Sequence, residues 1–141
     1  ADYAALVSTM HQVDPRSDRM GVRLQGQGGA ATGGGNVLSA GVPRGAVQVP
    51  PDGNPIVLLA DHQTTGGYRV PAVVISADQW QIAQLRPGDA VRFVATTRRM
   101  ALLAWRERQA AIIAATQAGP PLDDAVLIRG FCEAALGEDV L

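Results

Sequence analysis

The residues best suited to chemistry form one polar loop. Residues 61–68 read Asp-His-Gln-Thr-Thr-Gly-Gly-Tyr and follow directly on the apolar run 56–60. Asp61 could act as a base or anchor the loop, and the amide and hydroxyl groups offer adaptable hydrogen bonds. The two glycines let the backbone approach a ligand closely, and Tyr68 adds an apolar ring with a donor tip. The loop is therefore either a binding site presented by a rigid strand or a hairpin turn that happens to carry polar side chains. We favour the binding site.

A second polar group lies near the start of the chain, where Ser17, Asp18 and Arg19 precede a strand-like run. Asp or Ser in such a turn commonly accepts hydrogen bonds from backbone amides. Arg also presents a planar fork of donors that suits a carboxylate or another polar substrate. The sequence leaves the turn and the recognition interpretations open.

Composition restricts the class of protein. The chain has 141 residues, 47% hydrophobic residues and a formal net charge of −1, which is typical of one globular domain. All 12 basic residues are Arg, so Schiff-base chemistry, a Walker-type phosphate lysine and biotinyl-lysine are excluded on this chain. There is no basic excess for nucleic acid and no apolar run long enough to span a membrane. We expect a cytoplasmic protein, because a single cysteine allows no internal disulfide.

Metal ligation is not expected. The chain has two histidines, His11 and His62, and one cysteine, Cys132, all far apart in the sequence. Metal sites need several N, S or O ligands at suitable spacing. The glycine-rich segment 26–36 lacks the strand and helix context of a phosphate-binding fingerprint, so we interpret it as a flexible loop.

Strands dominate the first two thirds of the chain. Apolar runs and alternation predict strands over 20–24, 46–50, 56–60, 72–75 and 90–95. Residues 1–10 form either a short helix or the approach to a strand. The turn at 51–54 predicts a β-hairpin, and the run 56–60 should be a central strand buried on both faces.

Two helices are also predicted, one before and one after the last strand. We predict a short helix from Ser76, its N-cap, to about Leu85, and a long one from 98 to about 117 capped by Thr96 or Thr97. The predicted domain organisation is a β-barrel portion over 1–96, a helix packing on it over 97–118, and a linker with a weak helix of unknown role over 119–141. The chain begins Ala-Asp-Tyr, and we expect it to be a piece of a longer protein.

Five motifs in fixed order carry a family resemblance. They are Ser-Asp-Arg-Met-Gly at 17–21, Pro-Arg-Gly-Ala-Val-Gln-Val-Pro-Pro-Asp-Gly at 43–53, the loop at 61–68, Val-Ile-Ser-Ala-Asp at 74–78 and Gln-Leu-Arg-Pro-Gly-Asp at 84–89. Together they resemble the KipA, or allophanate hydrolase subunit 2, family, whose members include the C subunit of 5-oxoprolinase and the carboxyltransferase region of urea carboxylase. The resemblance covers the C-terminal half of a family member. His62 stands where the family usually has Arg, so the charge normally present at that position is either lost or made pH-dependent.

The resemblance implies a mainly β fold, a cyclophilin-like β-barrel of which this chain is half, with one short and one long helix toward the C-terminus. It implies a component of an ATP-dependent 5-oxoprolinase that converts 5-oxoproline to glutamate. The implied partners are a KipI-like protein (the B subunit), a LamB/YcsF-like protein (the A subunit), and the N-terminal half of the family's own chain. ATP is expected on another subunit. An isolated half would expose barrel edges, so we also expect pairing or homo-oligomerisation.

Two alternatives remain open. One is a biotin-dependent carboxyltransferase or allophanate hydrolase-type component that acts on a urea-like amide, with biotin on a separate carrier. The other is a non-catalytic regulator that binds a KipI-like inhibitor of a sensor kinase. Matched motif positions give the candidate catalytic residues Asp61, Gln63 and Thr64, and the candidate substrate-binding residues Asp18, Arg19, Gln48, Thr65, Gly66, Gly67 and Tyr68.

Overall fold

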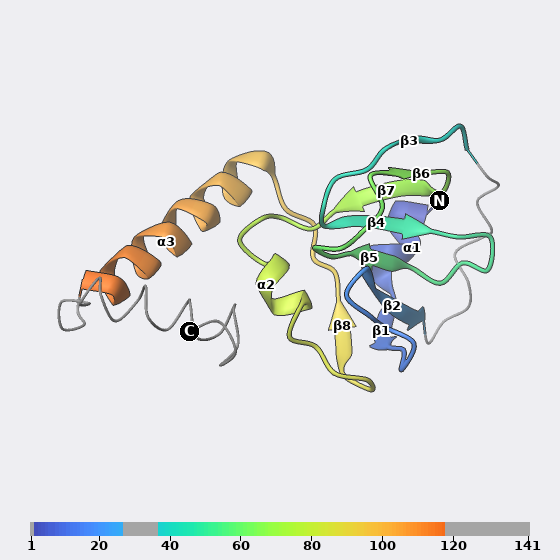
Figure 1. Ribbon diagram of the computed structural model, residues 1–141, viewed down its shortest axis with the longest axis horizontal. Coiled ribbons are helices and arrows are strands. Elements are labelled where there is room, and N and C mark those ends of the chain that lie inside the picture. The colour runs from blue at the N-terminus through green and yellow to red at the C-terminus, as the bar shows by residue number, and fades with distance from the viewer. Residues whose placement is uncertain (1, 27–36, 118–141) are drawn as a thin grey trace, which may run out of the picture. The chain divides into compact units, whose positions relative to one another are not determined.

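The computed structural model describes residues 2–26 and 37–117 (Figure 1). The chain divides into two units, residues 1–105 and residues 106–141. The predicted flexible loop, apart from Gly26, and the predicted linker and weak helix over 119–141 lie outside the described residues. The predicted domain bounds and the packing of 97–118 stay predictions.

The first unit contains an antiparallel sheet of six strands, in the order β7-β4-β5-β2-β1-β8. A two-stranded ribbon, β3 and β6, accompanies it, as Figure 1 shows. The strands are β1 Met10–Val13, β2 Gly21–Gly26, β3 Ala40–Gly41, β4 Ala46–Val49, β5 Ile56–Leu58, β6 Thr65–Gly66, β7 Arg69–Val73 and β8 Ala90–Arg92. The helices are α1 Asp2–Ser8, α2 Gln79–Ile82 and α3 Arg98–Gln117.

A hairpin of β4 and β5 forms the middle of the sheet. The Gly53 N–H donates to the Pro50 carbonyl at 2.9 Å, and Gly53 has a φ of 77°, a backbone conformation that glycine adopts without strain. The Asp52 carboxylate accepts the Asn54 N–H at 3.0 Å, which closes the turn. The strands then pair with Val47 opposite Val57. The predicted hairpin is confirmed.

The core lies on the faces of β1, β2, β4, β5 and β8. β5 pairs with β4 on one side and β2 on the other, so its predicted central position is confirmed. It ends at Leu58, however, and Ala60 is exposed, because the chain turns out of the sheet toward the loop at 61–68. The main cluster of buried apolar side chains is Leu6, Val13, Val22, Leu24, Val47, Val57 and Val91.

The two helices that follow β7 in the chain differ in how well the sequence predicted them. The long helix α3 matches its predicted range, and the Thr97 hydroxyl accepts the Met100 N–H at 3.2 Å at its start. The short helix is smaller than predicted, and the prediction of Ser76 as its N-cap is wrong. Asp78 is the N-cap residue and makes no side-chain cap hydrogen bond. The Asp78 N–H donates to the Ile75 carbonyl at 3.0 Å, so residues 75–78 form a turn before the helix begins.

The mainly antiparallel sheet and the long helix near the C-terminus confirm the predicted fold class, and they are consistent with a cyclophilin-like fold. No helix within the described ranges has the length and apolar character needed to cross a membrane.

Candidate functional site

An ion pair joins the two polar segments that the sequence singled out. Arg19 Nε lies 2.9 Å from Asp61 Oδ2, and the Asp61 N–H donates to the Arg19 carbonyl at 3.2 Å. The neighbouring backbone continues the contact, because the Leu59 N–H donates to the Met20 carbonyl at 2.9 Å. The Asp61 side chain is 46% exposed and that of Arg19 is 89% exposed. The two side chains contact each other and both remain accessible from solvent.

Asp18 has a different role from its neighbour Arg19. Its Oδ1 accepts the Met20 N–H at 2.8 Å and the Gly21 N–H at 3.1 Å. This is the arrangement of a carboxylate that closes a turn before a strand. The structure thus supports the turn interpretation for Asp18, while its predicted contact with substrate stays a prediction.

The buried side-chain amide of Gln48 contacts the loop at 61–68. Gln48 in β4 is 1% exposed, and its Oε1 accepts a hydrogen bond from Gln63 Nε2 at 3.2 Å. Gly66 lies against the same amide, since a Cβ added there would overlap Gln48 Nε2. A side chain at position 66 would therefore require the Gln48 amide to move.

Most contacts of the remaining loop residues are made by the backbone. The Thr64 carbonyl accepts the Val42 N–H at 3.0 Å, and the Gly67 carbonyl accepts the Val37 N–H at 2.9 Å. Thr65 pairs with Gly41 in the β3–β6 ribbon. His62 Nδ1 donates to the Gln63 carbonyl. These hydrogen bonds fix the backbone of the loop, while Gln63, Thr64 and Thr65 remain exposed.

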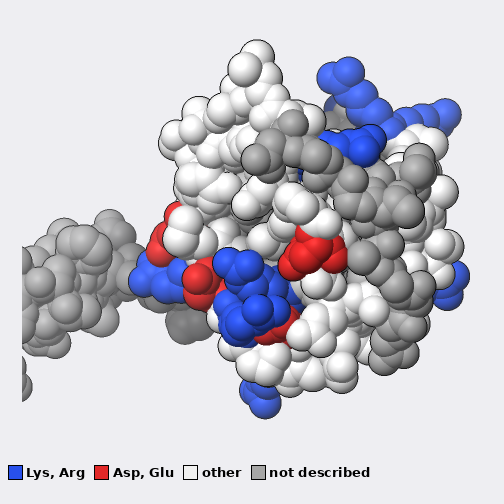
Figure 2. All heavy atoms as spheres, turned by 90° about the vertical axis from the view of Figure 1, so that its right-hand side faces the viewer, with Lys and Arg blue, Asp and Glu red and all other residues white. Residues whose placement is uncertain are grey.

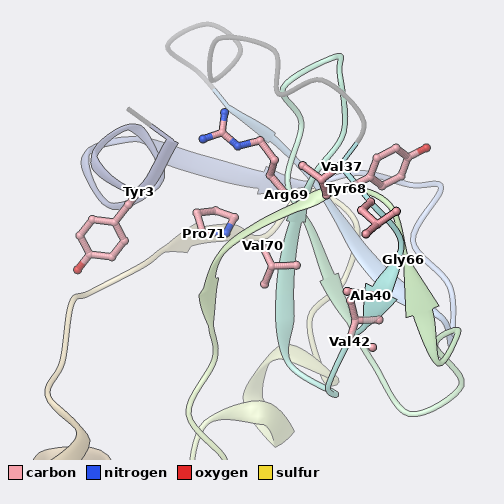
Figure 3. Close-up of a pocket in the computed structure, with 11 residues that line it drawn as sticks. Tyr3, Val37, Ala40, Val42, Gly66, Tyr68, Arg69, Val70 and Pro71 are labelled. Atoms are coloured by element: carbon pink, nitrogen blue, oxygen red, sulfur yellow. The ribbon is translucent and has the colours of Figure 1, made fainter.

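A pocket of about 590 Å³ opens beside the ribbon (Figure 3). Of the ten candidate residues, Gly66 and Tyr68 line it. No motif in the sequence pointed to the other lining residues, which come from α1, β3, β7 and the segments flanking β3. These are Tyr3, Val37, Leu38, Ala40, Gly41, Val42, Arg69, Val70 and Pro71. A second cavity of about 560 Å³ is lined by none of the ten candidates.

Asp14 is a buried carboxylate that lies outside the candidate site residues named from the sequence. It accepts the Arg16 N–H at 2.8 Å, Arg16 Nε at 2.9 Å and Arg16 Nη2 at 2.7 Å, and Gln25 Nε2 also donates to it. Chiefly because of the Arg16 side-chain hydrogen bonds, the pKa of Asp14 is held well below its ordinary value. The signal available in the sequence was an Asp-Pro-Arg turn directly after a strand.

Charges on the surface are mixed in sign. On the face in Figure 2, acidic and basic side chains lie beside one another between uncharged areas. Across residues 2–26 and 37–117, no three His, Cys, Asp or Glu side chains gather in a group that could hold a metal ion. The interactions that the structure shows at the candidate site are hydrogen bonds and the Arg19–Asp61 ion pair.

Comparison with known proteins shows relatives over the same part of the chain. The chain is 45% identical over 98 residues to the C subunit of 5-oxoprolinase from Escherichia coli (strain K12), which is 70% of this chain and 32% of that protein. It is 49% identical over 81 residues to the C subunit of 5-oxoprolinase from Haemophilus influenzae, 57% of this chain and 26% of that protein. The matched region therefore spans about a third or less of the length of these relatives.

Solved structures and a family model agree with these relatives. The crystal structure of the Kluyveromyces lactis urea carboxylase superposes with a TM-score of 0.71 at 26% identity, covering 86% of this chain and 12% of that one. The family model described as carboxyltransferase domain, subdomain A and B, matches residues 1–95, which include all ten candidate residues. The resemblance to the family of 5-oxoprolinase C subunits and urea carboxylase is confirmed, and the chain belongs to the carboxyltransferase domain, subdomain A and B, family.

Proposed function

We propose that this chain is part of a subunit of an ATP-dependent 5-oxoprolinase-type complex that converts 5-oxoproline to glutamate. The observation that carries the proposal is the 45–49% identity to two 5-oxoprolinase C subunits. The geometry supports it, because the Arg19–Asp61 pair and the Gln48–Gln63 bond bring three of the family motifs into one exposed site.

In this proposal the loop binds the substrate and other subunits supply the rest of the reaction. The proposed partners are a KipI-like protein (the B subunit) and a LamB/YcsF-like protein (the A subunit), and ATP binds on one of these. Asp61 is the proposed base or anchor, held by Arg19. Gln63 and Thr64 supply hydrogen bonds to the substrate, and the backbone of Gly66 and Gly67 allows its close approach.

The test uses the longer protein that carries this segment, combined with its two proposed partners. Asp61→Ala and Gln63→Ala should each strongly reduce 5-oxoproline-dependent ATP hydrolysis. Gln84→Ala is the matched control, because Gln84 is also exposed and lines neither cavity. Unchanged turnover in both loop variants would show that the site is elsewhere.

A second function is favoured by the similarity to urea carboxylase. In that case the chain is a carboxyltransferase component that acts on a urea-like amide. The biotin must come from a separate carrier, because this chain has no Lys. Calorimetry with a biotinylated carrier and the longer protein should then show binding, and its absence would leave the 5-oxoprolinase proposal as the better one.

A further inference from the structure

Gln48 is a polar side chain in a place that favours apolar ones. It lies in β4 between Val47 and Val49, and all four residues of the strand are buried. The pairing of β4 with β7 shifts register between Val47 and Val49, opposite the segment that holds Pro71. Such irregularities re-aim a side chain, and they are common beside functional sites.

The amide of Gln48 is only half satisfied. Its Oε1 accepts from Gln63 Nε2 at 3.2 Å, whereas its Nε2 is buried and has no hydrogen-bond partner among the described residues. Leaving a buried N–H group unpaired is costly, and an apolar side chain of similar size would avoid that cost. The fold also leaves position 66 without a side chain, so that this amide fits. The atom of Gln48 that makes an interaction is therefore its Oε1, which accepts the hydrogen bond from Gln63.

That oxygen fixes how Gln63 presents its own amide. Because Gln63 Nε2 donates to Gln48, the Gln63 oxygen is left for a ligand at an exposed position of the loop. The same loop carries the Asp61 carboxylate, in which Oδ2 faces Arg19 and Oδ1 remains a further acceptor. The Gln63 side-chain oxygen and Asp61 Oδ1 are both acceptors, and the ligand group that matches these two atoms is an N–H donor.

We infer that Gln48 is a positioning residue that orients Gln63, and that the site thereby selects substrates with an unsubstituted amide N–H, such as a lactam or a urea, over analogues that lack it. This inference rests on the proposed function and deepens it. A site built to hydrogen-bond a donor discriminates strongly against an analogue without one, because its acceptors are then left unpaired.

The test compares two ligands of nearly the same shape in the longer protein assembled with its partners. One is 5-oxoproline, and the other is its lactone counterpart, in which a ring oxygen replaces the N–H. The wild type should bind the lactam at least about tenfold more tightly than the lactone. Gln48→Met should abolish this ratio while leaving the melting temperature unchanged or higher, because the unpaired amide is gone.

Two further variants keep the result decisive. Gln63→Met, at an exposed position, should lose the same selectivity if Gln48→Met fails to fold. Gln84→Met should keep it. A merely structural role of Gln48 would change the melting temperature and not the ratio of the two affinities.

The outcomes separate this inference from the proposed function. Equal binding of lactam and lactone by a wild type that still hydrolyses ATP in response to 5-oxoproline overturns the inference alone. Tighter binding of the lactone also overturns it, since Gln63 would then present its N–H₂ group. No binding of 5-oxoproline and no dependent ATP hydrolysis overturn both.

Discussion

Two carboxylates, each paired with an Arg, follow strands of the same sheet and differ in what surrounds them. The side chain of Asp14 is 3% exposed and accepts hydrogen bonds from Arg16 and from Gln25. Asp61 is 46% exposed and forms its ion pair with Arg19. The first carboxylate is enclosed by its donors and stabilises a turn. The second is partly exposed, so in the proposed function it is the carboxylate that contacts the substrate.

Removing the enclosed charge should have the largest effect on stability. Asp14→Asn loses the charge that Arg16 and Gln25 stabilise, so the melting temperature at pH 7 should fall by several degrees. The folded pKa of Asp14 lies below its unfolded value of about 3.9. The stability it contributes is therefore fully present above that pH and is lost as the pH falls toward the folded pKa.

Thermal unfolding from pH 7 to pH 2 measures this. The difference between wild type and Asp14→Asn should shrink as the solution becomes acidic. Asp89→Asn is the control, because Asp89 is exposed and its carboxylate accepts the backbone N–H of Arg86. Parallel acid curves for wild type and Asp14→Asn would contradict the contrast between the two carboxylates.

Substitution of Gly66 tests whether the buried Gln48 side chain stabilises the loop that carries Asp61. In Gly66→Ala the new atom would overlap Gln48 Nε2, so Gln48 must move in a packed interior. We expect a loss of about 1–3 kcal/mol in the free energy of unfolding, measured with urea. Gly41→Ala in the partner strand β3 is the matched control, because its Cβ would meet nothing within 4 Å. Equal stabilities of the two variants would show that the loop is not tied to Gln48.

Breaking the exposed pair should cost the least stability. Arg19→Ala should change the free energy of unfolding by less than about 1 kcal/mol, because solvent screens the pair. It should still lower kcat/KM for 5-oxoproline-dependent ATP hydrolysis about tenfold or more, because Asp61 loses the partner that positions it. Steady-state kinetics of the assembled protein measure this. An unchanged kcat/KM in Arg19→Ala would show that Arg19 does not position Asp61 for the reaction.

Local patterns in the sequence carried most of the fold. The turn at 51–54, the apolar run beginning at Ile56 and the helix at 98–117 depend on interactions within a few residues, so they could be predicted. The helix near 79 began later than predicted, because a turn at 75–78 competed for the same backbone groups. Helix ends depend on such local competition, which propensity does not resolve.

The candidate site divides in the same way. The sequence by itself determined that the loop at 61–68 is polar, rich in glycine and part of an ordered set of family motifs. Only the tertiary structure decided that Arg19 pairs with Asp61, that Gln48 holds Gln63, and that Asp14 is enclosed. The Arg19–Asp61 and Gln48–Gln63 contacts join residues whose positions depend on strand register and on the approach of separate loops. Composition and spacing carry no information about either, because both are set when the whole sheet packs.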